Sequence, residues 1–139
     1  MALPSIGGGR QIGDGNINEI ALITQAAPQT ATDTATLTAA QITGGIIVGT
    51  PTGAATYTFP TVALLEAALV NAKVDSAFDL HIINVATTAA YDITVAVGTG
   101  WTFVGQLEVS SNDAITSQAQ GHFRARKTGS GTWTLYRLA

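Results

Sequence analysis

Apolar and polar residues alternate along most of this chain, with the period of two that is typical of β-strands with one face in solvent. Turn-forming Gly, Pro, Asn and Thr residues separate the alternating runs. The pattern predicts strands over residues 32–38, 46–48, 55–59, 78–85, 91–97, 101–104, 106–110, 121–127 and 132–138. A further apolar run, residues 20–24, is either a first strand or the junction between an N-terminal arm and the body.

One segment has the spacing of a helix instead. Val62, Leu65 and Leu69 lie at the i, i+3 and i+7 positions of a single apolar stripe, and Thr61 precedes them as a candidate N-cap. Pro60 ends the preceding strand because it has no amide hydrogen to donate to a neighbour. We therefore expect one short helix that ends near Val70 and packs across an open end or face of the sheets.

Many short strands and a single helix indicate an all-β fold. We expect an antiparallel β-sandwich or small barrel, jelly-roll-like, with one short helix and an extended N-terminal arm. Residues 78–85 and 91–97 are expected to be neighbouring antiparallel strands. The last two strands flank the Gly-containing turn at residues 128–131, which predicts a hairpin. No internal repeat is evident in the sequence.

The glycine-rich composition of residues 1–19 disfavours regular structure, so these residues are predicted to form the extended arm. Residues 20–139 are predicted to form a single β-rich domain. The arm is a candidate interface element because a segment of this length orders best against a neighbouring surface. Its candidate contact residues are Ile6, Arg10, Ile12, Ile17 and Ile20.

Composition strengthens the expectation of an assembly. Hydrophobic residues make up 46% of the 139 residues, but aromatic residues only 6% and charged residues 11%. Such a core is thin and such a surface is weakly solvated, which suits a chain packed against neighbours. The net charge of −3 argues against nucleic acid as a partner. No apolar run approaches the ~20 residues that span a membrane, so we expect a soluble protein without a membrane partner.

The residues that carry most enzymatic chemistry are sparse. The chain has no cysteine, and its two histidines, His81 and His122, lack a metal-binding spacing. The glycines near the N-terminus lack the lysine and the helix of a phosphate loop, and residues 14–25 depart from a calcium loop at two essential positions. We therefore expect a protein that is not an enzyme, with no catalytic residue, no metal site and no cofactor.

One charge pattern stands out near the C-terminus. His122, Arg124 and Arg126 occupy alternate positions of a predicted strand and share one face, with Lys127 beside them. This cationic stripe is either a solvated strand face or a docking surface for an acidic protein or glycan. Arg124 and Arg126 are the candidate contacts, since guanidinium groups bind carboxylates in a bidentate manner.

Several segments resemble small virion proteins of tailed bacteriophages in their strand pattern and composition. They are residues 35–59, 82–86, 97–101 and 123–138. Such proteins include head-decoration, or cement, proteins, which commonly form trimers over the joints between capsid subunits. The resemblance implies a homo-oligomer, expected to be a trimer, that binds the major capsid protein on the capsid exterior after synthesis in the host cytoplasm.

Two other functions are considered. A tail-fibre or receptor-binding module would recognise surface glycans, with Trp101, Trp133 and Tyr136 as stacking platforms, although these aromatics also suit a core. A small carbohydrate-active enzyme would need a convergent pair of carboxylates, for which Asp75, Asp79 and Asp92 are the candidates.

Overall fold

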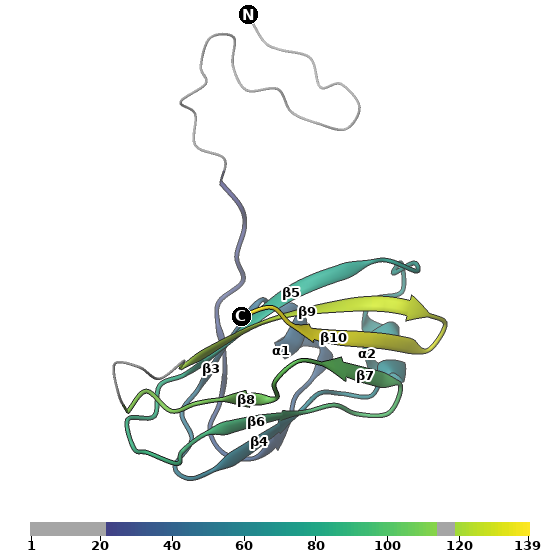
Figure 1. Cartoon of the computed structure of the whole chain (residues 1–139). Helices are drawn as coiled ribbons and strands as arrows, with labels where there is room; N and C mark the ends of the chain where they lie inside the picture. The colour runs from purple at the N-terminus through teal and green to yellow at the C-terminus, as the bar shows by residue number, and fades with distance from the viewer. Residues whose placement is uncertain (1–21, 114–118) are drawn as a thin grey trace, which may run out of the picture.

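Two β-sheets face each other and enclose the hydrophobic core (Figure 1). The computed structural model describes residues 22–113 and 119–139. The larger sheet has the order β1-β3-β5-β9-β10-β7, and the smaller has the order β2-β4-β6-β8. The strands of the larger sheet are β1 (Gln29–Ala31), β3 (Ile46–Gly49), β5 (Ala77–Asn84), β7 (Trp101–Val104), β9 (Gln120–Gly129) and β10 (Thr132–Arg137). Those of the smaller sheet are β2 (Ala35–Thr36), β4 (Ala55–Thr58), β6 (Ile93–Ala96) and β8 (Glu108–Val109).

The chain winds between the two sheets. From β1 to β8, each strand is in the sheet opposite to that of the preceding strand. Strands β1, β3 and β5 therefore stack in parallel in one sheet, and β2, β4 and β6 stack in parallel in the other. Helices α1 (Ala39–Thr43) and α2 (Val62–Ala68) occupy the first two returns from the smaller sheet to the larger one. The winding is a structural repeat that the sequence did not reveal.

Both helices begin in the same way. The Thr38 side chain accepts a hydrogen bond from the Gln41 amide at 3.2 Å, and the Thr61 side chain accepts one from the Leu64 amide at 3.4 Å. Each cap satisfies an amide that would otherwise lack a partner in the first helical turn. The prediction of Thr61 as a cap is confirmed. The prediction of a single helix is wrong, because α1 was missed. The strand predicted over residues 32–38 is reduced to β2, and β1 was not predicted.

The predicted antiparallel sandwich or jelly-roll-like barrel is wrong. Both sheets are mixed: in the described part of the chain, parallel pairs join β1 to β3, β3 to β5, β7 to β10, β2 to β4 and β4 to β6. The predicted neighbours at residues 78–85 and 91–97 contribute β5 and β6, which belong to different sheets. The hairpin of β9 and β10 is confirmed. Alternation fixes the buried face of a strand but not its partner, because backbone hydrogen bonds are the same for every sequence.

The core draws its large side chains from both sheets and from α2. Its largest fully buried members include Trp133, Tyr57, Phe59, Phe123 and Leu65. The Trp101 indole donates a hydrogen bond to the Pro60 carbonyl at 2.8 Å, and its ring meets that of Phe59 edge to face. These contacts hold the start of α2 against β7.

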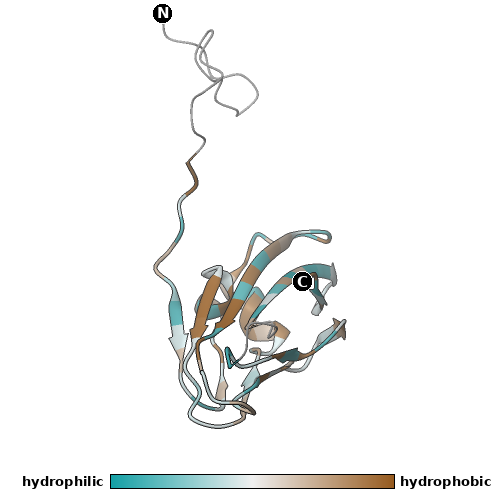
Figure 2. Ribbon diagram, turned by 60° about the vertical axis from the view of Figure 1, so that its left-hand side comes forward, coloured by the Kyte–Doolittle hydropathy of each residue, from teal (hydrophilic) through white to brown (hydrophobic). Residues whose placement is uncertain are grey.

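The N-terminal part of the described chain lies apart from this body. Residues 22–28 form no helix or strand and project from the sheets (Figure 1). An apolar stretch is visible on this segment at the first described residues (Figure 2). The predicted boundary at residue 19 and five of the predicted contact residues, Ile6, Arg10, Ile12, Ile17 and Ile20, lie outside the described residues. Within the described residues, no helix has the length and apolar character needed to cross a membrane.

Candidate interaction surface

The cationic stripe of β9 faces carboxylates of the same chain. Arg124 forms a bidentate pair with Asp79, with Nε–Oδ1 and Nη2–Oδ2 distances of 2.6 and 2.7 Å. The His122 Nε2 atom lies 3.1 Å from the same carboxylate. The hydrogen bonds from Arg124 are the main reason why the pKa of Asp79 falls to about 2, with a further contribution from His122.

The other two cations of β9 are paired as well. Arg126 binds Asp75, and the Lys127 ammonium lies 2.8 Å from Glu66 of α2. Glu66 also accepts a hydrogen bond from the Trp133 indole at 3.2 Å. Arg124 and Arg126 thus lie on the predicted exposed face, but each already has an acidic partner. The geometry favours a solvated, internally neutralised strand face over a docking surface for an acidic partner.

The aromatic platforms proposed for glycan stacking are largely inaccessible. Trp133 is 1% exposed and Trp101 is 8% exposed. Both indole nitrogens donate hydrogen bonds within the chain. Tyr136 alone of the three is partly accessible. The interpretation of the two tryptophans as core residues is therefore the one that their burial favours.

The fold brings the two histidines together, which their sequence separation did not indicate. The rings of His81 and His122 stack with centroids 4.2 Å apart, on neighbouring strands β5 and β9. Within the described residues, no group of three His, Cys, Asp or Glu side chains could hold a metal ion. The candidate carboxylates are also engaged: Asp75 and Asp79 bind arginines, and Asp92 accepts a hydrogen bond from the Ser111 amide at 2.8 Å. The engaged state of the three candidate carboxylates does not favour a catalytic pair for glycoside hydrolysis.

The most exposed large apolar side chains lie on the projecting segment. Leu22 is 88% exposed and Ile23 is 89% exposed. The segment is tied to the body at Gln25, whose amide nitrogen donates a 2.6 Å hydrogen bond to the Gly44 carbonyl after α1. Two adjacent apolar side chains on an extended, unpaired backbone are suited to bind a sheet edge or groove of a partner.

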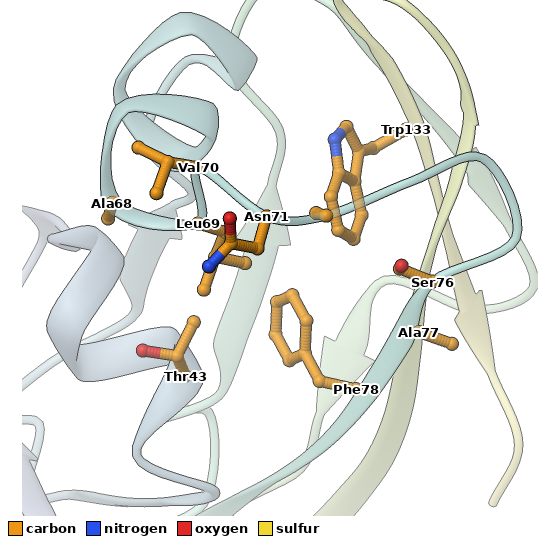
Figure 3. A pocket seen from close by; sticks show the side chains of 10 residues that line it. Thr43, Ala68, Leu69, Val70, Asn71, Ser76, Ala77, Phe78 and Trp133 are labelled. Carbon is orange, nitrogen blue, oxygen red and sulfur yellow. The ribbon is translucent and has the colours of Figure 1, made fainter.

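A groove of about 460 Å³ opens between the two helices and β5 (Figure 3). Its base contains Phe78 and Trp133, whose ring centroids are 5.8 Å apart. Leu69 and Val70 follow α2 on one side, and Thr43 at the end of α1 lies on another. Most of these lining groups are apolar, so the groove is a candidate site for an apolar side chain.

Neither the segment with Leu22 and Ile23 nor the groove was among the predicted contact sites. Residues 20–24 were correctly singled out as apolar, but Leu22 and Ile23 were not among the predicted contact residues. Their adjacency to a glycine-rich segment was the available signal. The sequence gives no signal for the groove, because its lining residues come from segments that are distant in sequence.

Comparison of the chain with protein-family models, with curated proteins and with solved structures gives no significant match.

Proposed function

We propose that this chain is a structural protein of a tailed-phage virion that binds the capsid exterior as a homo-oligomer, a trimer, and stabilises the shell. The observation that carries the proposal is the projecting segment with Leu22 and Ile23 almost entirely exposed. Burying such a side chain contributes about 1.5–3 kcal/mol. When these side chains are buried between copies, the resulting homo-oligomer presents each of its capsid contacts several times, so weak contacts with a repetitive capsid add up to durable attachment.

The state of the polar groups supports a structural role. The candidate carboxylates are held by arginines or a backbone amide, and the cations of β9 are paired within the chain. Among the described residues, every buried side-chain nitrogen or oxygen has a hydrogen-bond partner. Catalytic groups more often lie in strained or incompletely satisfied surroundings.

The glycan-binding alternative is less well supported. Aromatic stacking requires an exposed ring face, and Trp101 and Trp133 are buried. The engaged state of Arg124 and Arg126 also reduces their availability to an acidic glycan. The geometry thus favours binding through the projecting segment.

The proposal is tested by two measurements on the purified full-length chain. Light scattering is expected to give the mass of a trimer, and the chain is expected to sediment with assembled capsids that lack it but not with soluble glycans. A variant lacking residues 1–19 retains Leu22 and Ile23, so it should keep the trimer mass and bind capsids more weakly. A monomeric chain, or one that binds glycans and ignores capsids, contradicts the proposal.

A further inference from the structure

The first half of β5 lacks a neighbour on one side. Strand β9 pairs with β5 from Ala77 to Ile83, whereas β3 pairs with it only from His81 onward. Residues 77–80 therefore have one unpaired edge, although β5 is an interior strand of the larger sheet. Such an edge presents backbone groups to an additional strand.

Backbone geometry identifies the free groups. The His81 amide donates a 2.8 Å hydrogen bond to the Gly45 carbonyl, on the β3 side. Alternate residues of a strand direct their backbone groups to the same side, so those of Ala77 and Asp79 also point to the β3 side. Strand β3 begins at Ile46, opposite His81. In the described chain, no backbone group bonds Ala77 or Asp79 on that side.

The groove lies along this open edge. Ser76 and Ala77 lie on one side of its base residue Phe78, and the end of α2 forms the opposite wall (Figure 3). Val70 on the α2 side is 78% exposed. An extended peptide placed here would find backbone partners on β5 and an apolar space for a side chain. These are the two requirements of β-strand addition, in which main-chain bonds supply affinity and a pocket supplies specificity.

The described chain contains a segment with the complementary properties. Residues 22–24 are extended, make no strand pairing and carry the exposed Leu22 and Ile23. In its own copy the segment points away from the body (Figure 1). We propose that residues 22–24 of one copy add as a strand to residues 77–80 of a second copy, and that Leu22 or Ile23 enters the groove. This inference rests on the homo-oligomer of the proposed function and assigns its contact.

Disulfide trapping tests the contact directly, because the chain has no cysteine of its own. Two single variants, Ile23→Cys and Val70→Cys, are given tags of different mass, mixed and oxidised. The mixed disulfide is expected to form at least ten times faster than with Val104→Cys, a control at another exposed valine on β7. Equal rates for the two valine positions overturn the proposal. So does a cross-link that forms only when Ile23→Cys and Val70→Cys are in one chain.

A backbone substitution provides an independent test. Ala77→Pro removes the amide hydrogen that faces the groove, while the pairing of β5 with β9 uses the opposite side. The matched control, Ala77→Ser, keeps that hydrogen. With circular dichroism showing that both variants are folded, the proline variant is expected to lose the oligomer mass and the serine variant to retain it. A folded proline variant with unchanged mass overturns the proposal, and if that variant does not fold, the disulfide rates decide.

The two proposals fail in different ways. A trimer that binds capsids but shows no selective cross-link refutes the strand contact alone. A selective cross-link in a chain that ignores capsids refutes the capsid role alone.

Discussion

The two halves of β5 belong to one strand but differ in their surroundings. The second half, His81–Asn84, lies between β3 and β9, and its apolar residue Ile82 is fully buried. The first half, residues 77–80, is paired only with β9, although its Leu80 is also fully buried, so the two halves differ in backbone pairing. There, Asp79 is joined to β9 through Arg124 and His122.

This difference shows how a stable core and an unfilled binding edge coexist in one strand. The second half has its backbone bonds and its packing within the chain. The first half is held in place by β9 and by cross-strand ion pairs, so its other side can remain open.

The largest effect is expected in the doubly flanked half. Ile82→Ala removes a fully buried side chain and should lower the free energy of unfolding by about 2–5 kcal/mol. Ile83→Ala, on the less buried face next to it, serves as the control and should cost clearly less. Urea unfolding monitored by tryptophan fluorescence measures both. Equal losses would show that the face of β5 that carries Ile82 is not the better packed one.

Proline substitutions should distinguish the two halves of β5 by the backbone hydrogen bonds that each half makes on the β3 side. Ile83→Pro removes an amide on the β3 side and leaves a carbonyl of β3 without its partner, at a cost of about 2 kcal/mol beyond Ile83→Ala. Ala77→Pro removes an amide with no such partner and should change stability by less than about 0.5 kcal/mol. Both are compared in a chain carrying Leu22→Asp and Ile23→Asp, which removes the proposed partner strand. A large loss from Ala77→Pro in that chain would mean that the edge is already paired.

Strand β3, which flanks the second half of β5, pairs on its other side with β1. The Tyr57 hydroxyl donates a 2.8 Å hydrogen bond to the Ala31 carbonyl, so Tyr57→Phe should cost about 1 kcal/mol. Burial raises the pKa of Tyr57 from 10.0 to about 12. Its unfolded form ionises first, so this contribution is complete below pH 10 and is lost as the pH rises towards 12. Tyr57→Phe should flatten that part of the stability profile, and an unchanged alkaline slope would contradict this role.

The smallest effect is expected from the ion pair of the first half. The pKa of Asp79 is lowered from 3.8 to about 2, chiefly by hydrogen bonds from Arg124. The resulting stability is present above pH 4 and is lost as the pH falls towards 2, because the unfolded carboxylate is protonated first. Asp79→Asn should slightly destabilise the domain at pH 7 and weaken this acid dependence. Both partners are partly exposed, and solvent screening keeps the effect small. Acid unfolding of the two chains side by side is the measurement.

The sequence predicted individual elements better than their arrangement. The strand at residues 78–85, the hairpin of β9 and β10 and the start of α2 at Thr61 were all identified correctly. The helix α1 was missed, although its capping box of Thr38 and Gln41 is a local signal. The cationic stripe was placed on the correct face, but its partners Asp75 and Asp79 lie more than 40 residues away in the sequence.

The sequence alone determined the strands from residue 46 onward, which of their faces are buried and the position of the apolar pair Leu22 and Ile23, but it did not indicate β1. These properties follow from side chains that are close together in the sequence, through alternation, turn residues and capping. Tertiary structure decided the parallel winding between two sheets, the neutralisation of the β9 cations and the open edge beside Ala77. Those features depend on which strand edges pair. Backbone hydrogen bonds are the same whichever side chains the paired strands carry.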